Sequence, residues 1–559
     1  MIDLKIVLKK WLQKGGTTLI KKKWLVLVLL SFMLILAACS DKETSAPEGQ
    51  ELDDEALENF NESDMPIVND PITINIMAGK YASNSDNYNE LLVWKTYEEM
   101  TNIHINWTLV PFEGREEKRN LALAGGTLPE VFYTMAMPNQ DLLKYGEQGV
   151  FVKLNDLIDK YMPNLTALFE QYPEIKQGAT FPDGNIYGLP TIYDPQFTSV
   201  LLGSKGWIRQ DWLEQLEMDM PETIDDFYNY LKAVKETDLN ENGKNDEVPY
   251  GATEISGLRD ILKGAFGIGN KGSKQPYLDE DPDTGELRFY PISDGYKELL
   301  TYLNKLYSEG LIQENIYSID RNQSYGMGTE GLYGSTVSSS PITAYGDEMG
   351  KNFVGLPALE GPAGKQYNKV GTPLSGMGGF VITNENKNIP ATLRWMDYFY
   401  SEEGAELFFM GKEGETFEVD ENGDLQYLDK ITDSPDGLSM AQEIANYFTW
   451  SGGGYPGIVK ERTFNGAETL PESLEATEKL EANLLDEIWP NFTYTVEENN
   501  ELSSLQSDIH KYVNEMQDKF ITGNEPLSKW DDYIKRIETM NLEKYMEIQN
   551  DAYNRYKNN

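Results

Sequence analysis

Alternating apolar and polar residues mark the start of the folded part of the chain. Residues 72–77 and 103–110 alternate in this way, and a short apolar run occupies 130–134. A helical pattern lies between the first two segments at about 87–100, and a polar helix is expected at about 113–124. The order strand, helix, strand, helix, strand is typical of an α/β domain with a mainly parallel sheet, so we expect that fold class.

An apolar run near the N-terminus has the features of a signal peptide. Residues 24–36 are apolar and follow three lysines, but the run is shorter than the roughly 18 residues that a permanent membrane span needs. It ends in Leu36, Ala37, Ala38 and Cys39, which resembles the bacterial lipobox. That resemblance implies removal of residues 1–38 and a lipid on Cys39, and hence attachment to the extracytoplasmic face of the cell membrane. The alternative is a free or buried cysteine after an ordinary cleavage site.

Charge and composition exclude several classes of function. The 559 residues include 48 Lys and Arg against 92 Asp and Glu, a net charge of -44. Such a chain is not built to hold nucleic acid, because that binding requires cations that neutralise phosphates. A single cysteine cannot form an internal disulfide, and two histidines cannot supply a histidine-based metal cluster. Residues 39–65 are acidic and poor in large apolar residues, so we expect an extended tether there, or alternatively a polar helix around 51–60.

Several segments, in order, resemble the extracellular solute-binding proteins of ABC importers. The closest branch is the large lipoproteins related to alginate- and oligosaccharide-binding receptors. The segments that carry the likeness are 117–130, 151–158, 183–190, 207–213, 221–227, 390–400 and 411–417. The resemblance implies an α/β, two-lobed, periplasmic-binding-protein-like (type II) fold with a hinge and an interlobe cleft. It also implies an oligosaccharide ligand, ABC permease subunits as partners and no enzymatic activity.

The same resemblance suggests how the two lobes divide the chain. We expect residues 66–200 and 372–412 in the first lobe, and residues 201–371 and 413–559 in the second. Crossings near 200, 372 and 412 would then form the hinge.

One loop, residues 238–247, has the composition of a cation site. Oxygen-bearing side chains stand at alternate positions, and Gly243 occupies the sixth place, where the chain must turn sharply. A full EF-hand loop has a bidentate Glu at its twelfth position, which is Pro249 here, so the loop is a shortened variant. The expected calcium ligands are the side chains of Asp238, Asn240, Asn242, Asp246 and Glu247 and the carbonyl of Lys244. The resemblance to alginate receptors implies the same set.

Three carboxylates among these ligands favour calcium over magnesium, and we expect the ion to be structural. The alternative is a surface loop of Asx turns without a metal. Two further acidic segments, 279–285 and 420–423, are expected to be hairpin turns.

Aromatic residues in loops are the candidate ligand contacts. Aromatic rings pack against the C–H faces of sugars, and tyrosine and tryptophan also donate hydrogen bonds. Ordinary packing is the alternative for each of them. The candidates are Tyr81, Tyr133, Tyr325, Tyr333, Trp450 and Tyr455.

Two other classes of function share part of this pattern. A sensory lipoprotein that signals to a membrane kinase would have the same fold and cleft. An extracellular polysaccharide-degrading enzyme would need a positioned acid and base, and the sequence contains no recognisable nucleophile motif. We favour the hypothesis that the protein captures an oligosaccharide by closure of two lobes and then delivers it to an ABC importer.

Overall fold

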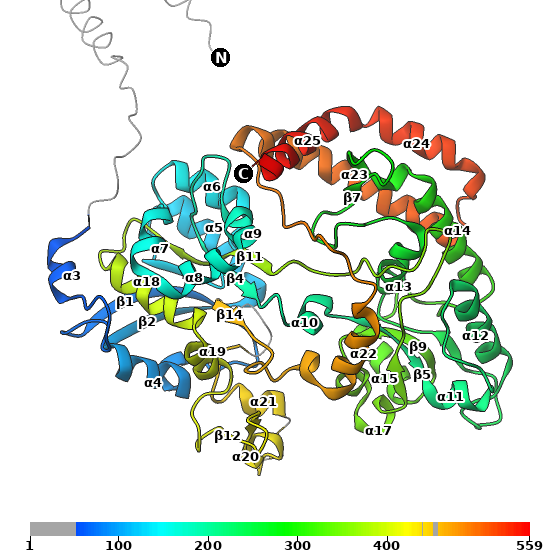
Figure 1. Cartoon of the computed structure of the whole chain (residues 1–559), viewed down its shortest axis with the longest axis horizontal. Coiled ribbons are helices and arrows are strands. Elements are labelled where there is room, and N and C mark those ends of the chain that lie inside the picture. The colour runs from blue at the N-terminus through cyan, green and yellow to red at the C-terminus, as the bar shows by residue number, and fades with distance from the viewer. Residues whose placement is uncertain (1–51, 436, 439, 451–456, 559) are drawn as a thin grey trace, which may run out of the picture. The chain divides into compact units, whose positions relative to one another are not determined.

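Two β-sheets, of six and four strands, organise the protein (Figure 1). The first sheet packs in one large hydrophobic core, and the second packs in another large core and in a small cluster around Trp207 and Tyr333. The computed structural model describes residues 52–435, 437–438, 440–450 and 457–558. Residues Leu52–Asn559 form one compact unit. Within the described residues, no helix combines the length and apolarity that crossing a bilayer requires.

The first sheet has six strands and contains the strands expected from the alternating pattern. Its order is β14-β4-β11-β3-β1-β2, with β1 parallel to both β2 and β3, and β11 antiparallel to both β3 and β4. The predicted α/β class with a mainly parallel sheet is therefore confirmed for this part. The strands are β1 (Ile72–Lys80), β2 (Ile103–Pro111), β3 (Val131–Tyr133), β4 (Leu189–Tyr193), β11 (Leu374–Ile382) and β14 (Gly457–Val459).

Helices cover this sheet and bring distant segments together. The indole of Trp94 on α4 stacks on Trp395 of α18, with ring centroids 5.5 Å apart, and the hydroxyl of Tyr97 donates to the Trp395 carbonyl. The segment after residue 372 thus returns to the first core. The helices of this half are α3 (Asp54–Asn59), α4 (Leu92–Thr101), α5 (Arg115–Gly125), α6 (Asn139–Glu147), α7 (Asn155–Tyr161), α8 (Pro163–Gln171), α9 (Pro173–Ala179), α18 (Ile389–Asp397), α19 (Glu402–Phe409), α20 (Asp429–Thr432) and α21 (Met440–Ile444).

The second sheet has four strands in the order β10-β5-β9-β6. Its strand β5 is buried along its whole length and pairs antiparallel with β9 and β10, whereas β6 is parallel to β9. The strands are β5 (Lys205–Arg209), β6 (Val248–Tyr250), β9 (Tyr333–Ser338) and β10 (Phe353–Gly355).

Helices of the second half include α23, α24 and α25 from the C-terminal end of the chain, of which the long α23 packs on α14 (Figure 1). The helices are α10 (Thr198–Leu202), α11 (Gln210–Gln215), α12 (Ile224–Glu236), α13 (Ser256–Leu262), α14 (Asp294–Ser308), α15 (Arg321–Thr329), α16 (Pro341–Tyr345), α17 (Asp347–Gly350), α22 (Pro471–Glu481), α23 (Val496–Thr522), α24 (Trp530–Thr539) and α25 (Leu542–Asn558). Short 3₁₀ turns are η1 (Tyr88–Glu90), η2 (Phe112–Gly114), η3 (Lys263–Phe266), η4 (Tyr290–Ile292), η5 (Tyr398–Tyr400), η6 (Ala467–Thr469) and η7 (Leu527–Lys529).

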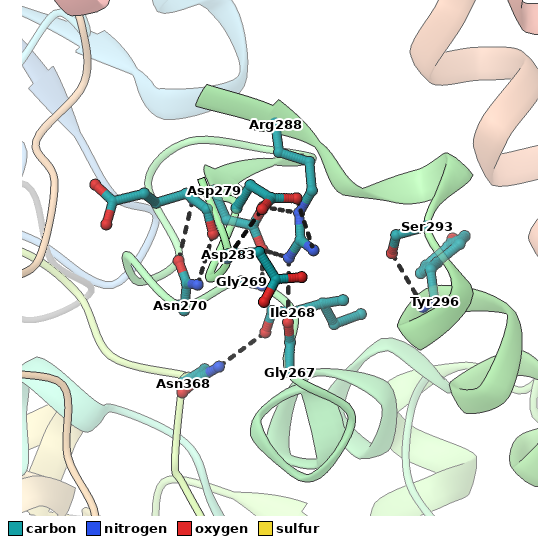
Figure 2. Close-up of polar contacts among 12 residues, drawn as sticks. Gly267, Ile268, Gly269, Asn270, Asp279, Asp283, Arg288, Ser293, Tyr296 and Asn368 are labelled. Atoms are coloured by element: carbon teal, nitrogen blue, oxygen red, sulfur yellow. Dashed lines mark hydrogen bonds and ion pairs between the residues drawn. The ribbon is translucent and has the colours of Figure 1, made fainter. Parts of the chain in front are cut away.

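Both acidic segments expected to be turns connect antiparallel strands. The first predicted turn begins inside β7 (Leu278–Glu280), since residues 279 and 280 are strand, and continues to β8 (Leu287–Phe289). The pair β12 (Phe417–Val419) and β13 (Leu425–Tyr427) encloses the second. In the first hairpin, the fully buried Asp279 receives two hydrogen bonds from Arg288, of 2.8 and 2.7 Å, and a third from the Gly269 amide (Figure 2). The sequence prediction of two hairpins is confirmed.

Two of the predicted boundaries differ from the structure. The first core begins before residue 66, because Phe60 is buried and the preceding residues form α3 with an Asp53 cap, as in the alternative of a polar helix. It also extends past residue 412, since apolar residues between Phe417 and Phe464 pack in the first core rather than the second. Buried aromatic side chains hold both segments against this core, although the segments are acidic in composition.

Candidate functional site

The chain crosses between the two large cores three times: at α10, near Gly371 and near Glu468. Hydrogen bonds connect these three crossings. The first core takes in Val200 and the second begins at Leu202, on helix α10. On that helix the Ser199 hydroxyl donates to the Glu468 carbonyl at 2.6 Å, and the Leu201 carbonyl accepts from the amide of Gly371 at 2.8 Å. All three connections therefore meet at α10, as they would at a hinge.

An aromatic platform lies at the carboxyl ends of β1 and β2. Lys80 and Pro111 pair at the end of the two parallel strands, so the residues that follow them are neighbours. The ring of Tyr81 stacks on Phe112 with centroids 3.7 Å apart, and the guanidinium of Arg115 lies 3.5 Å from the Phe112 centroid. We call these three residues, Tyr81, Phe112 and Arg115, the aromatic platform.

The platform is half-buried, which affects its charged and phenolic groups. Burial raises the pKa of Tyr81, with a smaller opposing effect from the cation of Arg115. Burial also lowers the pKa of the Arg115 guanidinium. A stacked aromatic pair that remains half-exposed at the carboxyl edge of a parallel sheet can receive the apolar face of a ligand.

The second half contains a cavity of about 420 Å³ at the carboxyl end of β9. Tyr325 lines it and is 36% exposed, and hydroxyl groups of several serines and threonines surround it. The charged residues in its lining are Glu254, Asp260, Arg321 and Lys369. We call this space the polar cavity.

Lys369 is a half-buried cation in the wall of the polar cavity. Its ammonium donates to the carbonyls of Ser204 at 2.6 Å and Leu202 at 3.3 Å, next to the first crossing. Burial lowers the pKa of Lys369 to about 8, although Asp260 opposes that effect. The hydroxyl of Ser338, also in the lining, is buried and has no hydrogen-bond partner among the described residues.

The aromatic residues expected to contact a ligand fall into different environments. Tyr81 belongs to the aromatic platform and Tyr325 to the polar cavity. Tyr133 and Tyr333 are 2% and 0% exposed and lie inside the two halves, so ordinary packing accounts for their rings. Trp450 is also largely buried, and its indole donates to the Phe409 carbonyl at 3.1 Å. Tyr455 lies outside the described residues, as does Cys39.

Sequence reasoning missed four members of these surfaces: Phe112, Arg115, Arg321 and Lys369. Phe112 could have been found from strand register, because it follows β2 as Tyr81 follows β1. Arg321 stands one helical turn before Tyr325 on α15, which also places it on the same face. Lys369 lies in a connection between elements, and no local pattern indicates its position.

The loop 238–247 is folded around the carboxylates expected to bind calcium. Asp238 accepts hydrogen bonds from the amides of Asn242, at 3.1 Å, and Gly243, at 2.8 Å. Glu247 accepts from the amides of Leu239 and Asn240 through Oε1. Its other oxygen, Oε2, is buried without a partner in the described structure.

The amide side chains complete the loop. The Nδ2 groups of Asn240 and Asn242 donate to Asp246, and these bonds lower the pKa of that carboxyl. Turning either amide by half a rotation would present Oδ1 to the same space. Gly243 has φ +83°, the left-handed conformation expected at the sixth place of the loop. No three Asp, Glu, His or Cys side chains in the described ranges lie together as a metal-binding group.

Residues of this loop nevertheless fit a calcium ion in donor type. Half of the expected ligands are amide or carbonyl oxygens and half are carboxylates, so the site does not require a cluster made of acidic side chains alone. The unpaired Glu247 Oε2 is a buried oxygen that a cation would satisfy.

Comparison with known proteins places the chain among binding proteins. A family model described as bacterial extracellular solute-binding protein matches residues 81–406. The fructooligosaccharide ABC transporter substrate-binding protein FusA of Streptococcus pneumoniae is 27% identical over 553 residues, which are 95% of this chain and 98% of FusA. Lipoprotein LipO of Bacillus subtilis is 29% identical over 420 residues, 71% of this chain and 74% of LipO.

Solved structures of FusA are also similar in fold. The complex of S. pneumoniae FusA with kestose has a TM-score of 0.69 at 27% identity, and covers 87% of this chain and 99% of FusA. A structure of an EF-hand mutant of FusA with fructo-nystose has the same TM-score at 26% identity and the same coverage. The similarity therefore extends over both sheets and the crossings between them.

Proposed function

Because the chain belongs to the family of bacterial extracellular solute-binding proteins, we propose that it captures an oligosaccharide and delivers it to an ABC importer. The observation that carries the choice of ligand is the pairing of an aromatic platform with a hydroxyl-rich cavity. Stacking surfaces and directional hydrogen bonds are the two kinds of contact that sugar rings use. The fructooligosaccharide receptor FusA, similar along nearly its whole length, supports the same ligand class.

Closure of the two halves about the three crossings is the proposed mechanism. An open state would expose the platform and the cavity, and a ligand that contacts both would favour the closed state. The ligand can shift the equilibrium between the open and closed states only by the difference between its affinities for them. The closed form would then dock on permease subunits, and a separate ATPase would supply the energy of transport.

Lipid attachment at Cys39 would keep the receptor beside its transporter. The lipobox-like residues before Cys39 support this anchor, and the similarity to a B. subtilis lipoprotein is consistent with it. A net charge of -44 repels the chain from anionic lipid, so acyl chains must provide the attachment. Replacement of Cys39 by Ser should release the protein from membranes into the medium, as followed by fractionation.

A structural calcium ion in the loop 238–247 is the second part of the proposal. The ligands would be the side chains of Asp238, Asn240, Asn242, Asp246 and Glu247 and the carbonyl of Lys244. The unpaired Glu247 oxygen supports it, and so does the structure of an EF-hand mutant of the relative FusA. The ion would stabilise the link between α12 and β6.

Chelation tests the calcium proposal with a matched pair of variants. At a free calcium concentration of 100 times the dissociation constant, the ion stabilises the native state by about 2.7 kcal/mol, so chelator should lower the melting temperature. Asp238→Ala should remove that response. Asp420→Ala is the control, because Asp420 also accepts backbone amides in an acidic turn but belongs to a hairpin. An equal response in wild type and Asp238→Ala would contradict the proposal.

The proposed receptor function is tested by calorimetric titration of the chain from residue 40 onward, which contains the whole compact unit. The panel comprises fructo-, galacto- and gluco-oligosaccharides, oligouronates and peptides. We expect saturable binding of a saccharide that is recovered intact. Tyr325→Ala should weaken that binding, whereas Tyr317→Ala, also at an exposed tyrosine but outside the cavity, should leave it unchanged. Binding of peptides alone, or breakdown of the saccharide, would contradict the proposal.

A further inference from the structure

The chain is kinked directly after β3, at the carboxyl edge of the first sheet. Thr134 has φ +52° and Ala136 has φ +48°, so two of three successive residues take the left-handed conformation without being glycine. That conformation is sterically costly for a residue with a side chain, and it persists only where surrounding contacts hold it. We call residues 134–137 the kinked segment.

Two glycines of the neighbouring strands leave room for the kinked segment. A Cβ on Gly79 of β1 would lie 2.7 Å from the Thr134 carbonyl oxygen, and a Cβ on Gly378 of β11 would lie 2.4 Å from the Met137 carbonyl oxygen. Main-chain atoms cannot turn aside to relieve contacts this short. The Thr134 amide also donates to the Gly379 carbonyl at 2.8 Å. The kink is therefore built into the packing of both neighbouring strands.

A buried arginine holds the kinked segment from one side. Arg119 of α5 is 4% exposed, and its Nη1 donates to the carbonyls of Met135, at 3.0 Å, and Ala136, at 2.6 Å. Hydrogen bonds from a charged donor are stronger than those from a neutral one. The two carbonyls are therefore fixed towards Arg119.

The peptide groups fixed by Arg119 turn their amides the other way. In a planar trans peptide, the N–H of one residue points opposite to the carbonyl of the residue before it. The amides of Ala136 and Met137 therefore point away from Arg119, and neither has an acceptor within the described residues. Main-chain donors are nearly always paired, and Ala136 is exposed, so these two amides can reach an acceptor outside the chain.

The kinked segment lies beside the aromatic platform. Strand β1 is parallel to β2 on one side and to β3 on the other, so the residues after the three strands share one edge of the sheet. Tyr81 and Phe112 follow β1 and β2, and the kinked segment follows β3. Arg115 and Arg119 are one helical turn apart on α5. Burial lowers the pKa of Arg115, and the charge of Arg119 lowers it further, so the two guanidinium groups are close enough to interact.

We propose that Arg119 is a positioning residue of the ligand site, which holds the kinked segment so that the amides of Ala136 and Met137 donate to oxygens of the saccharide on the aromatic platform. The inference rests on the proposed receptor function and adds a pair of main-chain donors to it. Hydroxyl and ring oxygens of a sugar accept from such donors. Because Arg119 already fixes the segment in the free protein, binding does not have to order it.

The test compares Arg119→Met with a matched variant, Arg394→Met, by calorimetric titration of the chain from residue 40 onward. Arg394 of α18 also donates to main-chain carbonyls, those of Asn61 and Ser63, which precede β1. The probes are fructo-, galacto- and gluco-oligosaccharides and oligouronates. Arg119→Met should weaken saccharide binding by about tenfold, the value of one or two hydrogen bonds. Arg394→Met should lower the melting temperature and leave the affinity unchanged.

A second substitution separates positioning from a general loss of stability. Glycine takes the left-handed conformation without a steric cost, so Ala136→Gly lets the kinked segment keep its shape without the arginine. Added to Arg119→Met, it should therefore tighten binding again, by about threefold. Arg119→Lys should retain part of the affinity, because an ammonium can still donate to the two carbonyls. An arginine that only supported the fold would give no recovery with Ala136→Gly.

Hydrogen exchange of the peptide 131–138, followed by mass spectrometry, reads the same segment directly. Without saccharide, the Thr134 amide should exchange faster in Arg119→Met than in the wild type, because its bond to Gly379 depends on the shape of the segment. Saturating saccharide should slow exchange of this peptide in the wild type, because two free amides gain acceptors. Exchange that is the same in Arg119→Met and the wild type would contradict the role of Arg119.

The outcomes separate this inference from the receptor function. Equal saccharide affinity of the wild type and Arg119→Met overturns the inference and leaves the receptor function standing. A loss of affinity that Arg394→Met shares, or that Ala136→Gly does not reduce, also overturns it, in favour of a purely structural arginine. Failure of every saccharide to bind the wild type contradicts both.

Discussion

The aromatic platform and the polar cavity differ in how they can hold a ligand. The platform presents the stacked rings of Tyr81 and Phe112 beside a cation, whereas the cavity presents hydroxyls, two cations, two carboxylates and an exposed tyrosine. Rings contribute contact area with little directional preference, and hydroxyls and ammonium groups select the position of ligand oxygens. The comparison suggests that the first surface provides affinity and the second provides specificity.

The largest expected effect concerns the buried ammonium of Lys205, the first residue of β5. Lys205 has a pKa of about 8 in the folded protein against 10.5 ordinarily, so between these pH values the unfolded chain binds more protons. Unfolding free energy should therefore rise with pH across this window in the wild type relative to Lys205→Met. A shift of that size corresponds to about 3 kcal/mol at roughly 1.4 kcal/mol per pH unit.

Denaturant unfolding of both proteins from pH 7 to 10.5 measures this difference. Other titrating groups, including the many buried tyrosines, are common to both and cancel. Lys351→Met, at an exposed lysine, should show a constant difference from the wild type. A constant difference for Lys205→Met as well would mean that its ammonium is not destabilised by burial.

Removal of the platform should affect affinity strongly. Tyr81→Ala should weaken saccharide binding by about 10- to 100-fold, equivalent to about 1.4 to 2.7 kcal/mol, because Tyr81 has the free face of the stacked pair. Phe112→Ala should weaken binding by removing the ring on which Tyr81 stacks. Calorimetry of the two single variants and the double variant measures this. The double variant should lose less than the sum, since the rings contact each other. Unchanged affinity would remove the platform from the site.

A smaller effect should distinguish two tyrosines of the second half. Tyr325 is exposed in the cavity, whereas the hydroxyl of the buried Tyr333 lies 3.1 Å from the Ser324 hydroxyl. Tyr325→Phe should therefore change saccharide affinity and leave the melting temperature unaltered. Tyr333→Phe should instead cost about 1 kcal/mol of stability, the usual value of one hydrogen bond. The reverse pattern would place Tyr333 in the binding surface.

Local patterns predicted much of the first half. Alternation identified β1 and β2, and helical spacing identified α4, because these signals depend on neighbouring residues. The stacking of Trp94 on Trp395 was beyond such reasoning, since it joins segments far apart in the chain. For the same reason the acidic composition after residue 412 concealed a segment that belongs to the first core.

The candidate site was predicted less well than the fold. Tyr325 and Tyr333 belong to one short stretch of sequence, yet one lies on the open face of α15 and the other starts a buried strand. Loop position alone could not separate them. Lys205 and Lys369 are distant in sequence, so no local pattern indicated that their ammonium groups influence each other.

The most direct test of the central claim is the distance between the two surfaces with and without ligand. The chain has one cysteine, Cys39, so the chain from residue 40 onward accepts specific labels at two introduced cysteines. Glu113→Cys beside the platform and Asn322→Cys beside the cavity lie at exposed positions. Paired spin labels at these positions should show a shorter distance once a saccharide that binds in calorimetry is added. The same distance distribution with and without saturating saccharide would contradict capture by closure of the two halves.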